Sequence, residues 1–261
     1  MGHLDRSIRP GARWLLGLAG LMLTEVVMAR AASECDGLAM SIYKDKSLGA
    51  PLDRAHMIEQ QGKGCDTTGQ YALSLALLYQ EGKALDHADE IARAALAKGS
   101  PLAPNLRHLL AESELSRGHV AQAYAMGEKV AQDYPNYVGV RGMLGTIDAQ
   151  EGRWEAALEQ AKQWNAIDGS ASSLITMTTI LYQLKRYDET ADAYLKAIKI
   201  EPNRIAATLG LTEAVFALAK LHRGPEAAEL LKQHIAANAN WRQSAPPELI
   251  AAAQRLGLVD H

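Results

Sequence analysis

A period of about 34 residues constrains this chain more than any other feature of its sequence. A large apolar residue followed by a small one recurs at spacings of 35, 34, 33 and 34 residues. These pairs are Leu75-Ala76, Leu110-Ala111, Leu144-Gly145, Met177-Thr178 and Leu211-Thr212. A second series of small residues keeps the same phase, at Ala88, Ala123, Ala157 and Thr190. A repeat of this length holds one helix pair that cannot bury its own apolar face, so the period predicts stacked helical repeats.

The stretch from Ala171 to Arg204 is the best-formed repeat. It reads as two amphipathic helices joined by a tight turn at Lys185-Arg186, and Pro202 closes it. The composition supports helices throughout, because the apolar content is rich in Ala and Leu, the best helix formers, and Phe216 is the single phenylalanine. The sequence therefore predicts an all-α fold.

The first 31 residues have the composition of an export signal. A basic start precedes an apolar run, Trp14–Leu23, and the small residues around Arg30 fit a cleavage site after Ala31. The alternative is an uncleaved membrane anchor, but a span needs about 20 apolar residues, and Glu25 interrupts this one. Without residues 1–31 the chain has 23 basic and 28 acidic residues, a net charge of −5. No basic face is therefore expected for nucleic acid, and none is predicted to bind.

Residues 32–68 are predicted to form a helical hairpin at the N-terminal end. One helix is expected over 37–47 and a second over 51–61, with a turn at Gly49-Ala50-Pro51 between them. The two cysteines, Cys35 and Cys65, then lie at adjacent ends of the hairpin. In an exported chain an even cysteine count favours a disulfide, which would close this cap. Two unpaired buried thiols are the alternative.

The repeats resemble the tetratricopeptide repeat (TPR) family, whose signature combines a Leu-Gly pair with Trp, Tyr, Ala and Pro at fixed positions. The matching residues include Leu144-Gly145, Trp154, Ala157, Tyr187, Tyr194, Ala197 and Pro202. The 69–103 repeat, through Leu75-Ala76, Tyr79 and Gly82, also resembles Sel-like repeats. The resemblance implies a right-handed α-solenoid of stacked helix-turn-helix repeats with helical caps. The expected ranges are 69–103, 104–137, 138–170, 171–204 and 205–240, with a capping helix in 241–261. In the 205–240 repeat, Leu221–Pro225 is expected to lengthen the turn.

In the TPR family the first helix of each repeat lines a concave groove that takes a protein or peptide segment. Carried onto this chain, the resemblance implies groove positions on each first helix. They are Leu73, Leu77, His108, Glu112, Thr146, Ile175, Thr179, Tyr182, Leu209, Glu213 and Phe216. Leu73, Leu77, Ile175 and Leu209 have core packing as an equal alternative. Tyr182 and Phe216 are the preferred anchors, because an exposed aromatic ring suits peptide binding.

No catalytic, metal or cofactor motif stands out. The eight histidines make no HExxH pair, and phosphate-cradling and nucleophile-elbow motifs are absent. The run Asp86–Glu90, which includes His87, is expected at a helix start, where acids are favoured. We expect no enzyme activity, no metal and no cofactor. The predicted function is a periplasmic TPR scaffold for envelope assembly, in pilus, secretion, polysaccharide-export or cytochrome-maturation machinery. Three alternatives are a membrane-anchored adaptor facing the periplasm, an enzyme with its site between the N-terminal cap and the repeats, and a self-associating structural module.

Overall fold

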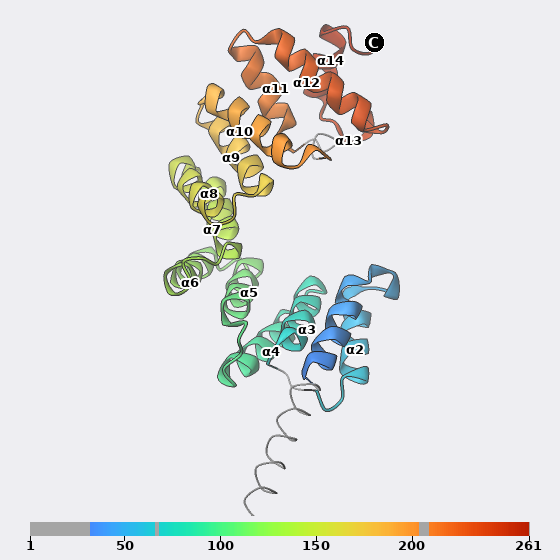
Figure 1. Cartoon of the computed structure of the whole chain (residues 1–261). Helices are drawn as coiled ribbons and strands as arrows, with labels where there is room; N and C mark the ends of the chain where they lie inside the picture. The colour runs from blue at the N-terminus through green and yellow to red at the C-terminus, as the bar shows by residue number, and fades with distance from the viewer. Residues whose placement is uncertain (1–31, 66–67, 204–208, 261) are drawn as a thin grey trace, which may run out of the picture. The chain divides into compact units, whose positions relative to one another are not determined.

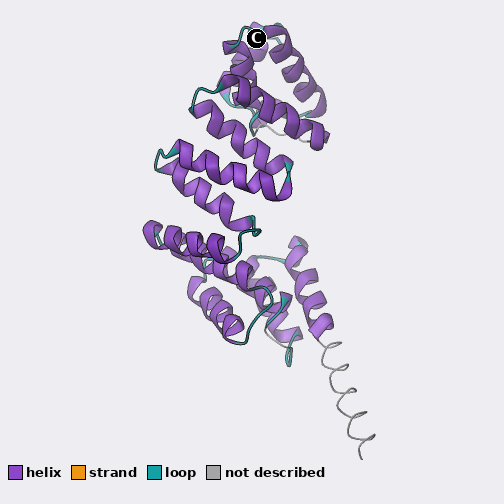
Figure 2. Cartoon of the chain, turned by 60° about the vertical axis from the view of Figure 1, so that its left-hand side comes forward, coloured by secondary structure: helices purple, strands orange, loops and turns teal. Residues whose placement is uncertain are grey.

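The protein is helical throughout the residues that its computed structural model describes, 32–65, 68–203 and 209–260. Those residues contain helices, turns and loops and no strand (Figure 2). The predicted all-α class is therefore confirmed. The predicted signal peptide, 1–31, lies outside the described residues. The chain divides into two compact units, Met1–Arg117 and Gly118–His261, which we describe separately.

The first unit is a stack of short helices that pack in chain order. Residues 32–44 are helical, and the next elements are η1 (Lys46–Leu48), α2 (Pro51–Gln61), α3 (Gln70–Glu81), α4 (Leu85–Ala97) and α5 (Ala103–Ser116). Each of α2, α3 and α4 packs against the helix that follows it (Figure 1). Ile58, Leu78, Leu106 and Leu109 are fully buried between them. Their burial supplies the main stabilisation of this unit.

The N-terminal hairpin is closed by the predicted disulfide. Cys35 and Cys65 are bonded, with their Cα atoms 5.7 Å apart. A second link is the Asp36 carboxylate, which accepts a hydrogen bond of 2.7 Å from the backbone N–H of Tyr71 in the first turn of α3. The hairpin is thereby tied to α3 as well as to itself.

Both bounds predicted for the first hairpin helix, residues 37 and 47, are wrong, because residues 32–36 are also helical. The helix ends at residue 44 and a separate 3-10 turn, η1, follows. Asp45 causes the break, because its carboxylate accepts hydrogen bonds from the Ser47 backbone N–H at 3.0 Å and from the Ser47 hydroxyl at 2.6 Å. A short acidic side chain that bonds the backbone two residues ahead stabilises a turn at the expense of the helix.

The second unit continues the pattern of paired helices. Its elements are α6 (Val120–Asp133), α7 (Gly139–Gln150), α8 (Trp154–Asp168), α9 (Ala171–Gln183), α10 (Tyr187–Ile200), α11 (Leu211–Lys220), α12 (Gly224–Ala237), α13 (Trp241–Ser244) and α14 (Pro247–Arg255). Helices α6 to α12 pack in chain order (Figure 1). Trp241 and Leu249, from α13 and α14, join a buried cluster with Tyr194, Leu211 and Leu231. The last two helices therefore cover an apolar face of the repeats.

The turns inside the helix pairs share one backbone conformation. Within each unit, one residue in each such turn has a positive φ, between 58° and 72°. These residues are Lys83, Gly152, Lys185 and His222. The predicted lengthening at Leu221–Pro225 is wrong, because three residues separate α11 from α12, as they separate α9 from α10. His222 takes the left-handed position, and Pro225 lies in the first turn of α12, where a proline is tolerated.

Gly145 marks a close approach between α7 and α8. A Cβ atom placed on it would lie 3.4 Å from Gln160 Cβ and 3.6 Å from the Ala157 carbonyl oxygen. These are ordinary van der Waals distances, so a methyl group at this position would contact α8 without displacing it. The small residues that define the repeat thus set the spacing of these two helices.

Candidate functional site

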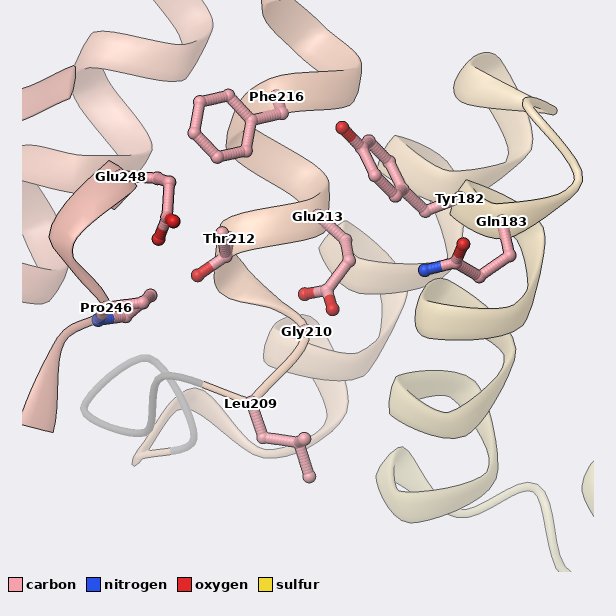
Figure 3. Close-up of a pocket in the computed structure, with 9 residues that line it drawn as sticks. All are labelled: Tyr182, Gln183, Leu209, Gly210, Thr212, Glu213, Phe216, Pro246 and Glu248. Carbon is pink, nitrogen blue, oxygen red and sulfur yellow. The ribbon is translucent and has the colours of Figure 1, made fainter. Parts of the chain in front are cut away.

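The second unit gathers predicted groove residues around a pocket between α9, α11 and the start of α14. This hollow, which we call the acidic pocket, has a volume of about 490 Å³. It is lined by Tyr182, Gln183, Leu209, Gly210, Thr212, Glu213, Phe216, Pro246 and Glu248 (Figure 3). Four of the predicted residues, Tyr182, Leu209, Glu213 and Phe216, meet here although they come from two different repeats.

Tyr182 presents a half-buried ring at the edge of this pocket. The ring packs on Tyr187, at 5.7 Å between centroids. Burial, with the neighbouring Tyr187 and Glu213, raises the pKa of Tyr182. The phenol therefore keeps its proton at neutral pH and offers a hydroxyl and an apolar face together. Such a side chain is suited to anchoring a bound peptide.

Two carboxylates line the acidic pocket, and each lies in the first turn of a helix. Glu213 belongs to α11 and Glu248 to α14. The helix dipole stabilises acidic side chains at such positions. Among the described residues neither carboxylate pairs with a cation, and no Lys or Arg lines the pocket. The pocket therefore has a negative charge that no cationic side chain of the described part of the chain neutralises.

Gly210 fixes the start of α11 below this pocket. Its φ is 79°, and a Cβ atom there would lie 3.2 Å from Tyr194 Cδ2. Glycine meets both demands, a left-handed backbone and a close contact. Tyr194 itself is fully buried, and its hydroxyl has no hydrogen-bond partner among the described residues. Burial, together with the charge of Glu213, raises the pKa of Tyr194 well above its usual range.

A second hollow, which we call the apolar pocket, adjoins the first and shares Leu209 with it. Its volume is about 430 Å³. It is lined by Gly145, Thr146, Ala149, Gln150, Trp154, Ile175, Thr176, Thr179, Ile180 and Leu209. Leu209 is predicted to lie on a first helix, but it precedes α11 in the turn that leads to Gly210, where it is 66% exposed. The two pockets together, named here the two-pocket groove, run along the first helices α7, α9 and α11.

The predicted groove residues of the first unit have a different environment. Leu73 is buried and Leu77 is half-buried. On α5, His108 Nε2 lies 3.6 Å from Glu112 Oε1. Burial lowers the pKa of His108 to about 4 and raises the pKa of Glu112. His108 is therefore neutral at pH 7, and its contact with Glu112 is not a salt bridge between two charged groups.

Sequence reasoning missed the residues that the pockets take from outside the first helices. Trp154, which belongs to α8, lines the apolar pocket. Pro246 and Glu248, from the start of the terminal helix, line the acidic pocket. From the sequence, a cap is the preferred role of this terminal helix, and a partner-binding helix is the alternative. The exposed acid in the first turn of that helix was a signal in the sequence, but only the fold brings it to Glu213.

The junction between the N-terminal hairpin and the repeats is the place where an alternative enzyme site was considered. Tyr79, buried there, donates a 2.8 Å hydrogen bond to Glu59 Oε1. Burial, aided by Glu59, raises the pKa of Tyr79 to about 12. This phenol holds its proton at neutral pH and is a poor general base. Within the described residues, no three or more His, Cys, Asp or Glu side chains gather as a metal site would require.

No protein-family model and no curated protein matches the chain. Among solved structures it is similar to YrrB, described as a TPR protein with an unusual peptide-binding site. That match has a TM-score of 0.53 and 15% identity, over 77% of this chain and 97% of YrrB. A crystal structure of MamA matches with a TM-score of 0.53 and 15% identity, over 69% of this chain and 96% of MamA. These similarities show the fold.

The helices of the described ranges were also compared with the needs of a lipid bilayer. None of them combines the length and the hydropathy of a membrane-spanning segment.

Proposed function

Since the chain has the tetratricopeptide-repeat fold, we propose that it is a non-catalytic scaffold that binds a segment of a partner protein in the two-pocket groove. The observation that carries the proposal is the pair of adjoining hollows, of about 490 and 430 Å³, on the first helices of the second unit. Pockets of this size accept several side chains of one bound segment. YrrB, a TPR protein with a peptide-binding site, is a precedent on the same fold.

The groove combines the features that a peptide site needs. The apolar pocket supplies aliphatic and aromatic contact area, and the acidic pocket supplies the polar groups that fix orientation. Both are built on helices, which hold their side chains in defined positions. The groove therefore favours recognition of a segment over catalysis.

We propose that the scaffold works outside the cytoplasm, in the periplasm, where it serves envelope assembly. The Cys35–Cys65 disulfide supports an oxidising compartment. The predicted signal in 1–31 supports export. Amino-terminal sequencing of the exported protein tests the export route: a start at Ala32 is expected, whereas retention of the first 31 residues would favour the membrane-anchored alternative.

Site-specific photocrosslinking tests the binding function directly. A benzophenone amino acid is placed at Thr179, in the apolar pocket, and in a control protein at Lys196, on the exposed side of α10. Both proteins are irradiated in envelope extract. A defined adduct is expected from Thr179 and not from Lys196. Equal labelling from the two positions, or labelling from neither, would contradict a partner in the groove.

A further inference from the structure

We propose that the acidic pocket receives a basic side chain, arginine or lysine, of a partner segment whose neighbouring apolar side chains enter the apolar pocket. The inference rests on the proposed function and specifies the chemistry of the partner. The partner segment is expected to carry a positively charged residue next to apolar residues.

Charge complementarity is the first argument. Glu213 and Glu248 line one pocket, and within the described chain neither has a cationic partner. Glu213 is half-buried, which weakens its screening by water. Its influence reaches two tyrosines, since it contributes to the raised pKa of both Tyr182 and Tyr194. An incoming cation is attracted to such a pocket, and an incoming carboxylate is repelled.

The aromatic rings supply the second argument. Tyr182 on α9 and Phe216 on α11 line the same pocket as the carboxylates (Figure 3). The face of an aromatic ring attracts a cation, and an arginine guanidinium also stacks on it. Carboxylates together with rings suit a guanidinium better than they suit an aliphatic or an anionic side chain. The pocket volume of about 490 Å³ leaves room for the long side chain and part of its backbone.

The third argument is that the two pockets share one lining residue. Leu209 lines both pockets, so a segment that fills one of them continues into the other. On the far side of Leu209 the lining residues include Ile175, Ile180 and Trp154, and none of the described lining residues is charged. Residues next to the basic one are therefore selected for apolar character. The structure assigns the groove a mixed partner, basic at one end and apolar at the other.

Selection from a phage-displayed library of random 12-residue peptides tests the inference on the chain without residues 1–31. The same selection is run on the double variant Glu213→Gln, Glu248→Gln. The matched control is Glu159→Gln, Glu229→Gln, which removes equal charge from exposed positions on α8 and α12. Circular dichroism melting shows whether each variant is folded, and crosslinking from Thr179 identifies the peptides that bind in the groove.

The expected result is groove-bound peptides enriched in Arg or Lys beside apolar residues, with affinity about tenfold or more weaker for the pocket variant and unchanged for the control. Should the pocket variant not fold, salt titration of the wild-type protein replaces it, because a charge-dependent contact weakens as salt rises. Groove-bound peptides without basic enrichment, or with affinity insensitive to salt, would overturn the inference and leave the proposed function standing. Absence of any groove-bound peptide would overturn both.

Discussion

The first and second units place acidic side chains at the same position of the repeat in different surroundings. Glu112 follows Leu110 by two residues, as Glu213 follows Leu211. In the first unit, Glu112 lies 3.6 Å from a half-buried neutral histidine, His108, and desolvation raises the pKa of Glu112. In the second unit, Glu213 lines an open pocket with no cationic partner in the described chain.

A second pair of equivalent positions differs in the same way. Gln80 and Tyr182 follow Leu75 and Met177 by five residues. Gln80 Nε2 donates a 3.1 Å hydrogen bond to the Leu109 carbonyl oxygen, which links α3 to α5. Tyr182 instead offers its ring to the acidic pocket. The repeat position sets the direction of a side chain, and the packing of the neighbouring helices decides whether that side chain is structural or available for binding.

The largest expected effect comes from the covalent link that the first unit has and the second lacks. Cys35→Ser, Cys65→Ser opens a loop with a sequence separation of 30 residues. The loss of stability is expected to be roughly 3–4 kcal/mol in the loop-entropy model. Denaturant unfolding followed by circular dichroism measures it. Crosslinking from Thr179 should persist in the folded double variant, and its loss would break the assignment of binding to the second unit.

The next largest effect is a dependence of folding stability on pH, which His108 in the first unit causes. Burial holds the pKa of His108 at about 4, below its ordinary value of 6.5. Between those values the unfolded chain binds more protons, so His108 costs stability as the pH falls through 6.5, and the loss levels off below 4. The full loss is about 3 kcal/mol. Unfolding of the wild type and of His108→Asn, measured from pH 7.5 to pH 4, gives this contribution as a difference.

Glu112 has the opposite effect on how the free energy of unfolding depends on pH. Because its folded pKa is raised, protonation stabilises the folded state as the pH falls through that pKa. Glu112→Gln should therefore steepen the loss of stability toward low pH. A wild-type profile identical to that of His108→Asn would contradict the burial of a neutral His108.

A smaller effect tests the helix spacing on which the apolar pocket depends. Gly145→Ala places a methyl group at ordinary contact distance from Gln160 and Ala157, so the contact itself costs little. Gly145→Leu overfills the same contact and should lower stability by about 1–3 kcal/mol. Thermal melting of both variants measures the difference. Equal melting temperatures for the two variants would show that α7 and α8 are not held together at this residue.

The sequence predicts the parts of the molecule that depend on local packing. The alternation of large and small residues, as at Leu144-Gly145, predicts the helix pairs because those residues decide how closely two helices approach. Cys35 and Cys65 are paired correctly because a hairpin brings its own ends together. The candidate site depends on elements distant in sequence, and helix phase alone does not show that Glu248 lies beside the pocket of Glu213. The exposure of a side chain also depends on residues distant in sequence, since Leu209 is 66% exposed whereas Leu73 is buried.

The smallest expected changes in stability come from substitutions at Tyr182 and Gln80, which occupy equivalent repeat positions with different roles, one in binding and one in structure. Tyr182→Ala removes a half-buried ring that lines the acidic pocket, so we expect about tenfold weaker binding of groove-selected peptides and a small change in melting. Gln80→Ala, at the equivalent position of the first unit, removes the hydrogen bond to Leu109 and should cost about 1 kcal/mol with binding unchanged. Peptide titration and thermal melting of both variants give the two readouts. A loss of binding in Gln80→Ala, or unaltered binding in Tyr182→Ala, would mean that equivalent repeat positions do not divide between structure and binding as the two units indicate.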